Sequence, residues 1–310
     1  MPDLTCCVCN EPAIRQIGAR GFCDKHFASA TRERKHAWLN QAYLVGGLVV
    51  FVGLVYLLDK TLHPALSGTA LVLAGALLAL VPATIWMVFF YLQDRLEPEP
   101  KGYLLGVFLL GALLAAAVGS PLVDNVFHVS KWLYADTLTT ILGGILVVGF
   151  TQEFLKFAAV RFSVYQSREF DEATDGVIYA TAAGLGYATV LNLQFIVTSG
   201  GASLGASVIS MAVVALAQAS FAAISGYFLG RAKFEHHSIW GLPLGVSLAA
   251  VVNGLFNWLR GNLVQTGISL GRASVNPWMG LLLAALVAIA TTGITLWLVR
   301  RNIQAALAGK

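Results

Sequence analysis

Long apolar stretches alternate with short polar segments along most of this chain. Each apolar stretch holds about 20 residues or more, the length that a helix needs to cross about 30 Å of hydrocarbon. Because backbone polar groups in lipid must be bonded within their own segment, each stretch is expected to be a helix. The expected spans lie at about 38–58, 69–93, 103–123, 138–160, 175–198, 205–230, 239–260 and 278–299. The pattern predicts an all-α, polytopic membrane bundle of about eight transmembrane helices over residues 37–310.

Composition and charge agree with a membrane protein and set its expected orientation. Of the 310 residues, 57% are hydrophobic and only 12% are charged, too little charge to cover a soluble domain of this size. With the N-terminus inside, 15 of the 20 Lys and Arg residues fall in inner segments and only four in outer ones. This bias predicts a multi-pass protein of the cell membrane with both termini cytoplasmic. The net charge of +4 follows from the bias, so no nucleic-acid partner is expected.

The first 36 residues are polar and contain all four cysteines, which argues against a cleavable signal peptide. Cys6, Cys9, Cys23 and His26 form two short chelating pairs that can close a tetrahedral zinc site, with Cys7 as an alternative to Cys6. A closed site with four protein ligands is structural. The segment 1–36 is therefore expected to be a cytoplasmic, zinc-ribbon-like module and basic collar that docks a cytoplasmic protein or senses a signal. The alternative is a tail of unpaired cysteines.

Ionisable residues inside a span are candidates for function, because they cost several kcal/mol and face the bundle interior. Glu153 and Lys156 are three residues apart and share a helix face with Gln152. A self-neutralised pair near the cytoplasmic end remains the alternative. In the next span, Asp175 is expected to cap the helix start, and the small residues of 180–189 indicate close helix packing.

Five segments carry a resemblance to a known family. They follow one another in order at Phe89–Pro100, Phe150–Lys156, Asp171–Ile196, Gln218–Phe234 and Asn253–Trp258. Together they resemble the signature loop, the Glu-Glu-x-x-Lys helix, the Asp-Gly to Glu-Asn segment and the two His-bearing helices of the PrsW family of intramembrane metalloproteases. The resemblance covers about residues 85–265. It implies a membrane-embedded protease site.

The positions that match the family's site are largely substituted. Gln152 stands at the family's first Glu, Leu191 at the Glu before Asn, and Gln218 and Asn253 at the two His. The full set of matching positions is Gln152, Glu153, Lys156, Leu191, Asn192, Gln218, Asn253 and Asn257. A carboxamide is no base and is a weak zinc ligand, but it retains size and hydrogen bonding. None of the six histidines lies in an expected span, which argues against a catalytic zinc in the membrane.

The leading hypothesis is a PrsW-like pseudoprotease with a regulatory role. Its bundle would admit the transmembrane helix of a single-span partner without cutting it. One alternative is an active peptidase that uses Glu153 as base with altered or absent metal; another is a permease for a small molecule or ion. Counting about 1.5 Å per residue places Glu153 near the inner side and Leu191 far across the bilayer. Helix tilt or a break is therefore needed to bring these positions together.

Overall fold

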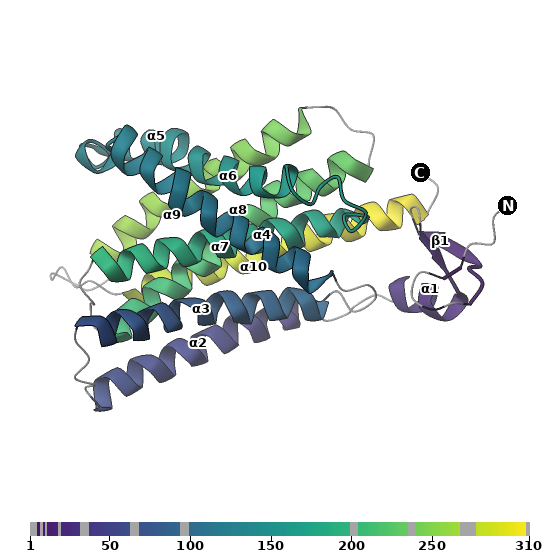
Figure 1. Ribbon diagram of the computed structural model, residues 1–310, viewed down its shortest axis with the longest axis horizontal. Coiled ribbons are helices and arrows are strands. Elements are labelled where there is room, and N and C mark those ends of the chain that lie inside the picture. The colour runs from purple at the N-terminus through teal and green to yellow at the C-terminus, as the bar shows by residue number, and fades with distance from the viewer. Residues whose placement is uncertain are drawn as a thin grey trace.

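The computed structural model describes residues 5–6, 9, 11–17, 20–31, 37–62, 68–93, 99–198, 204–234, 240–266 and 277–307 (Figure 1). Long helices make up most of this part of the chain. The α-helices are α1 Asp24–Thr31, α2 Ala37–Leu62, α3 Gly68–Gln93, α4 Lys101–Leu114, α5 Thr137–Gly143, α6 Phe150–Arg161, α7 Ala173–Thr198, α8 Leu204–Phe234, α9 Gly241–Thr266 and α10 Pro277–Leu307. Cys7, residues 32–36 of the basic collar and residues 94–98 of the signature loop lie outside the described residues.

Seven helical segments of the described chain are long and apolar enough to cross a membrane. They are Gly68–Val88, Lys101–Lys131, Thr137–Arg161, Ala173–Thr198, Ser207–Phe234, Gly241–Asn262 and Trp278–Thr295. The expected all-α polytopic bundle is thereby confirmed. Helix α2 covers the first expected span, 38–58, but it is not among these seven.

Helices α7 and α8 form the centre of the bundle. Their apolar windows are 67% and 83% buried, against 28–39% for the other spans. The small residues expected to favour packing allow this contact: a Cβ added at Gly184 of α7 would lie 2.6 Å from the backbone oxygen of Gln218 in α8. Gly184 therefore sets how closely Gln218 approaches the neighbouring helix.

Two spans contain wide, π-helical turns near the positions that match the family site. The turns η1 Ala115–Gly119 and η2 Leu122–Val126 follow α4 within the span Lys101–Lys131, and η4 Gly144–Gly149 leads directly into α6. Such turns are frequent at functional sites. A Cβ on Gly149 would lie 2.6 Å from the oxygen of Ala250, so this glycine lets η4 lie against α9.

Side-chain hydrogen bonds hold the segment that leads into α5. After the 3₁₀ turn η3 Val129–Lys131, Asp136 caps α5: its carboxylate accepts from the backbone N–H of Thr139 at 2.9 Å and from the Thr139 hydroxyl at 2.7 Å. These bonds hold the pKa of Asp136 below its usual range. Thr140 donates its hydroxyl hydrogen to the Leu133 carbonyl at 2.8 Å, which ties the loop to the helix.

A small N-terminal module lies at one end of the bundle, beside the C-terminal part of α10 (Figure 1). It consists of an antiparallel hairpin, β1 Arg15–Ile17 and β2 Arg20–Phe22, followed by α1. Arg15 joins hairpin and helix through an ion pair with Asp24 at 3.4 Å and a cation–π contact with Phe27 at 4.9 Å. Helix α5 lies at the opposite end of the molecule (Figure 1).

Candidate functional site

Polar side chains from three helices meet in the interior of the bundle. Helix α6 contributes Gln152, Glu153 and Lys156, helix α8 contributes Gln218, and helix α9 contributes Asn253. Glu153, Lys156 and Asn253 are completely inaccessible to solvent, and Gln152 and Gln218 are buried. These five residues form one hydrogen-bonded group, which we call the polar network.

Lys156 is the cation of this network. Its Nζ donates to Glu153 Oε1 at 2.6 Å and to Gln218 Oε1 at 2.7 Å. The rings of Tyr187 and Phe221 lie 5.9 and 5.8 Å from the same nitrogen, within the range of cation–π attraction. The ion pair between residues i and i+3 of one helix is therefore buried and held from several sides, rather than directed to the headgroups.

The amides complete the network. Gln152 Oε1 accepts from Gln218 Nε2 and from Asn253 Nδ2, both at 2.9 Å. Asn253 Nδ2 also donates to Glu153 Oε1 at 2.7 Å, and its own Oδ1 accepts from Asn257 Nδ2 at 2.7 Å. Among the described residues, Glu153 Oε2 is the one side-chain polar atom of the network that is buried without a partner. Most of the other polar atoms of the network are bonded within it or to Asn257.

Two of the positions expected at the site lie elsewhere. Asn192 donates from Nδ2 to the backbone oxygen of Met211 at 3.2 Å, which joins α7 to α8 rather than joining the network. Leu191 packs against the cluster formed by Ala115, Leu155 and Tyr187. Nevertheless, Leu191 and Gln152 line the same cavity.

This cavity has a volume of about 550 Å³ and adjoins the network. Gln152, Gln218 and Asn257 contribute to its wall, so three of the amides have one side on the cavity. Asp124 and Arg260 line it as well. The charge pattern predicts Arg260 only as one of the four outer cations, although its spacing of three from Asn257 and seven from Asn253 puts all three on one helix face.

Asp175 belongs to neither the network nor the cavity. Its Oδ2 accepts from the backbone N–H groups of Asp171 at 2.7 Å and Glu172 at 2.6 Å, at the start of α7. Asp175 is the third residue of α7 and not the N-cap that the sequence predicts; its carboxylate reaches back to the two N–H groups just before the helix. Nearby, the hydroxyl of Tyr179 donates to the buried carboxylate of Glu99.

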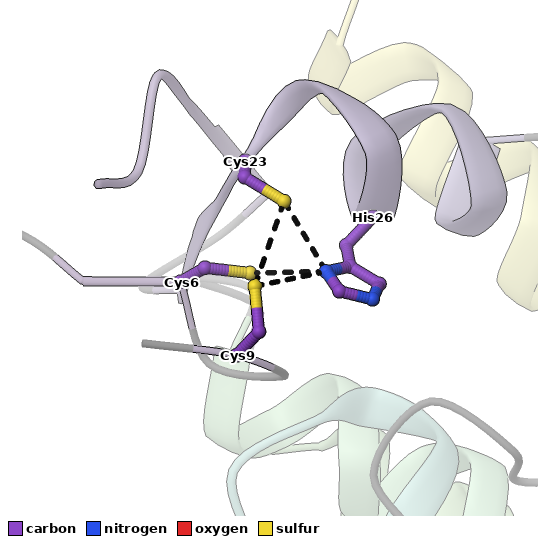
Figure 2. Close-up of side chains that lie close together, drawn as sticks. All are labelled: Cys6, Cys9, Cys23 and His26. Carbon is purple, nitrogen blue, oxygen red and sulfur yellow. Dashed lines mark hydrogen bonds between the residues drawn. The ribbon is translucent and has the colours of Figure 1, made fainter. Parts of the chain in front are cut away.

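The N-terminal module brings Cys6, Cys9, Cys23 and His26 together (Figure 2). Their ligand atoms all lie within 4.8 Å of one another, and His26 Nδ1 is 3.2, 3.3 and 3.6 Å from the sulfurs of Cys23, Cys9 and Cys6. Ligands at metal–nitrogen and metal–sulfur distances of about 2.0–2.3 Å are separated by roughly 3.3–3.8 Å in a tetrahedron. The cluster can therefore hold one metal ion. It is also the only group of three or more His, Cys, Asp or Glu side chains with this capacity in the described residues.

Comparison with known proteins agrees with the resemblance read from the motifs. The family model described as PrsW family intramembrane metalloprotease matches residues 99–291, a range that contains the whole polar network and excludes the N-terminal module. The match begins within the signature loop and extends beyond the expected end of the resemblance near residue 265.

Curated relatives are similar over most of their own length. Protease PrsW of Geobacillus kaustophilus is 27% identical over 201 residues, covering 64% of this chain and 84% of the relative. Protease PrsW of Halalkalibacterium halodurans is 30% identical over 182 residues, or 58% and 80% of the two chains. Protease PrsW of Bacillus subtilis is 26% identical over 187 residues, or 58% and 79%. No solved structure matches the chain significantly.

Proposed function

Because the chain belongs to the PrsW family of intramembrane metalloproteases, we propose that it is a member that has lost catalysis and binds the transmembrane helix of a partner protein. One observation carries the proposal. Gln152, Gln218 and Asn253, which match catalytic positions of the family by resemblance, bond to one another and to the Glu153–Lys156 pair. The site is thus retained as a hydrogen-bonded structure in which amides replace acids and imidazoles.

The residues of the network do not fit a catalytic metal. Zinc sites use imidazole, thiolate and carboxylate ligands, and a catalytic site usually has three of them. The network offers one carboxylate, Glu153, and its Oε1 is bonded to the ammonium of Lys156 at 2.6 Å. That ammonium also bonds Gln218 Oε1, so a fixed positive charge stands among the oxygens that a cation would need. Only Glu153 Oε2 is left, and one oxygen does not make a zinc site.

Binding of a partner helix is supported by the cavity beside the network. Apolar side chains, including Val148 and Val214, line much of it, while Gln152 and Gln218 present amide groups. Amides can donate to and accept from the backbone of a partner helix where that helix is locally unwound. A partner of this kind would be recognised without being cut, which suits a regulatory role.

In this proposal, residues 1–36 are a cytoplasmic module on a bundle that spans residues 37–310. Three thiolates and one imidazole are the donor set of structural zinc sites, so zinc is the proposed metal of Cys6, Cys9, Cys23 and His26. A filled four-ligand site folds the module without catalysing a reaction. The module and both termini would face the cytoplasm, where the module docks a cytoplasmic protein.

Two experiments test this function. The first compares the wild type in proteoliposomes with a variant in which Gln152→Glu, Leu191→Glu, Gln218→His and Asn253→His restore the family pattern. The wild type is expected to leave a panel of single-span proteins uncut; cleavage by the wild type overturns the proposal.

The second experiment places a photo-crosslinking amino acid at position 257 in cells. It is expected to capture a single-span membrane protein. The same amino acid at Leu146, which is 67% exposed on η4, serves as the lipid-facing control. Capture that is equal at both positions contradicts a partner site in the cavity, and Gln218→Ala or Asn253→Ala should weaken the specific capture.

A second candidate function rests on Glu153 Oε2, the buried oxygen without a partner in the described structure. A carboxylate oxygen left in this state could act as a general base in a metal-independent peptidase. In that case Glu153→Gln abolishes a measurable turnover and leaves the helical fold intact. Turnover that persists in this variant excludes the candidate.

A further inference from the structure

A polar stripe runs along helix α9 from the network to one end of the cavity. Asn253, Asn257 and Arg260 follow at spacings of four and three residues, so they lie on one face of the helix. The stripe spans roughly 10 Å at 1.5 Å per residue. Asn257 hydrogen-bonds Asn253, and Arg260 lines the cavity beyond it. The stripe thus ends in the guanidinium of Arg260. We define the mouth of the cavity as the lining residues Ser130, Tyr134, Trp258 and Arg260.

Arg260 is a partly buried cation without a carboxylate partner. Its Nη2 donates to the hydroxyl of Ser210 at 3.0 Å, which fixes the guanidinium but does not neutralise it. No ion pair between described residues includes Arg260. Asp124 lines the same cavity, but it is exposed and lies beyond ion-pair distance. Charged groups inside a membrane protein normally pair with an opposite charge, so this guanidinium is available for an anion.

The surroundings of Arg260 indicate which anion fits. Tyr134 and Trp258 belong to the same mouth, and such aromatic side chains are enriched at the level of lipid headgroups. The hydroxyl of Ser130 adds a neutral hydrogen-bond donor. Valine and leucine side chains, such as Val123 and Leu133, provide an apolar wall. A guanidinium matches the oxygens of a phosphate in two parallel hydrogen bonds.

From this arrangement we propose that the mouth of the cavity binds a phospholipid whose phosphate pairs with Arg260. The glyceride part of the lipid contacts the apolar wall, and the hydroxyl of Ser130 contributes a hydrogen bond to the headgroup. The bilayer supplies this ligand at high local concentration. The proposal goes beyond the role assigned to the polar network and holds whether or not the network is catalytic.

The test uses the purified full-length chain and native mass spectrometry of bound lipid. The probes are phosphatidylglycerol and diacylglycerol, which share the glyceride but differ in the phosphate. The wild type is expected to bind phosphatidylglycerol and to bind diacylglycerol much more weakly. Because hydrogen bonds to charged groups contribute about 1.5–3 kcal/mol, Arg260→Gln should weaken phosphatidylglycerol binding roughly 10- to 100-fold. Arg260→Lys, which keeps the charge and loses the fork, should show a smaller loss.

Arg301→Gln is the matched control, because Arg301 is an exposed arginine that stacks on Trp297 of α10 at 5.6 Å. It should bind phosphatidylglycerol as the wild type does. The proposal is overturned if phosphatidylglycerol and diacylglycerol bind equally, or if Arg260→Gln and Arg301→Gln behave alike. Displacement of the lipid by millimolar inorganic phosphate assigns the site to free phosphate instead. Preferential binding of a transmembrane peptide with an acidic residue, without lipid binding, assigns it to a protein. If Arg260→Gln loses its helical circular dichroism signal, the test uses the binding of phosphatidylglycerol by Arg260→Lys instead.

Discussion

Removal of the buried cation should be among the most destabilising single changes in this protein. Lys156→Met keeps the length of the side chain and deletes the ammonium, which leaves the carboxylate of Glu153 at 0% exposure without its counterion. Breaking a buried ion pair by removing one partner costs about 3–5 kcal/mol. The oxygen of Gln218 that accepts from Lys156 also loses its donor. We therefore expect the free energy of unfolding to fall by roughly 4 kcal/mol, in the upper part of the range for point mutants.

A double variant that removes both charges tests the buried ion pair further. Lys156→Met combined with Glu153→Leu removes both charges and leaves only orphaned amide groups, each costing about 1 kcal/mol. The double variant should therefore be at least about 2 kcal/mol more stable than Lys156→Met alone. The assay is reversible unfolding by SDS in mixed micelles, followed by far-UV circular dichroism. Lys131→Met, at an exposed position, is the control and should change stability by less than about 0.5 kcal/mol. The buried pair is refuted if Lys156→Met and Lys131→Met change the free energy of unfolding equally. It is also refuted if the double variant is less stable than Lys156→Met alone.

Two further predictions use the same unfolding assay. Gly149→Ala puts a Cβ 2.6 Å from the oxygen of Ala250, so η4 must move from α9 and about 1–3 kcal/mol should be lost. Gly102→Ala has open space around its Cβ and should cost nothing; equal effects of the two would contradict the close approach. Asn257→Ala deletes a hydrogen bond to Asn253 and should cost only about 0.6 kcal/mol, the mean for such bonds in a membrane protein; a loss above roughly 2 kcal/mol would show that Asn257 supports the whole network.

Much of this architecture could be predicted because it follows from local pattern. Apolar length predicts the spans, small residues predict the packing of α7 on α8, and two chelating pairs predict the cluster of Cys6, Cys9, Cys23 and His26. The pairing of Glu153 with Lys156 follows from their spacing on one helix, whereas the burial of the pair does not. These features depend on neighbours in the sequence or on a requirement that the bilayer imposes on each segment separately.

Depth in the bilayer could not be predicted in the same way. Gln152 and Leu191 line one cavity although helix α6 runs only about 14 Å from Gln152 to its end, while α7 runs about 27 Å from its start to Leu191. The segment after α6 is bonded to the end of α8. Its carbonyls at Tyr165 and Phe170 each accept from Lys233 at 2.6 Å, close to the end of α8. Such long-range contacts carry no periodic signal.

Arg260 shows a second limit of sequence reasoning. A charge near the end of a span normally indicates topology, and the sequence pattern predicts only that role for Arg260. Its place in the cavity depends on the loop before α5, which folds over from a different part of the chain. The spacing predicts that Asn253, Asn257 and Arg260 share one helix face, but it does not predict the cavity that Asn257 and Arg260 line.

The most direct test of the central claim is the zinc content of the purified full-length chain and of its Cys9→Ser/Cys23→Ser variant. The proposed function predicts about one zinc per chain in the wild type, bound by the N-terminal cluster, and none in the variant. This result would leave the polar network free of metal, in agreement with its donor set. Zinc that remains in the variant would place a metal within the bundle, and the chain would then have to be treated as an active metalloprotease.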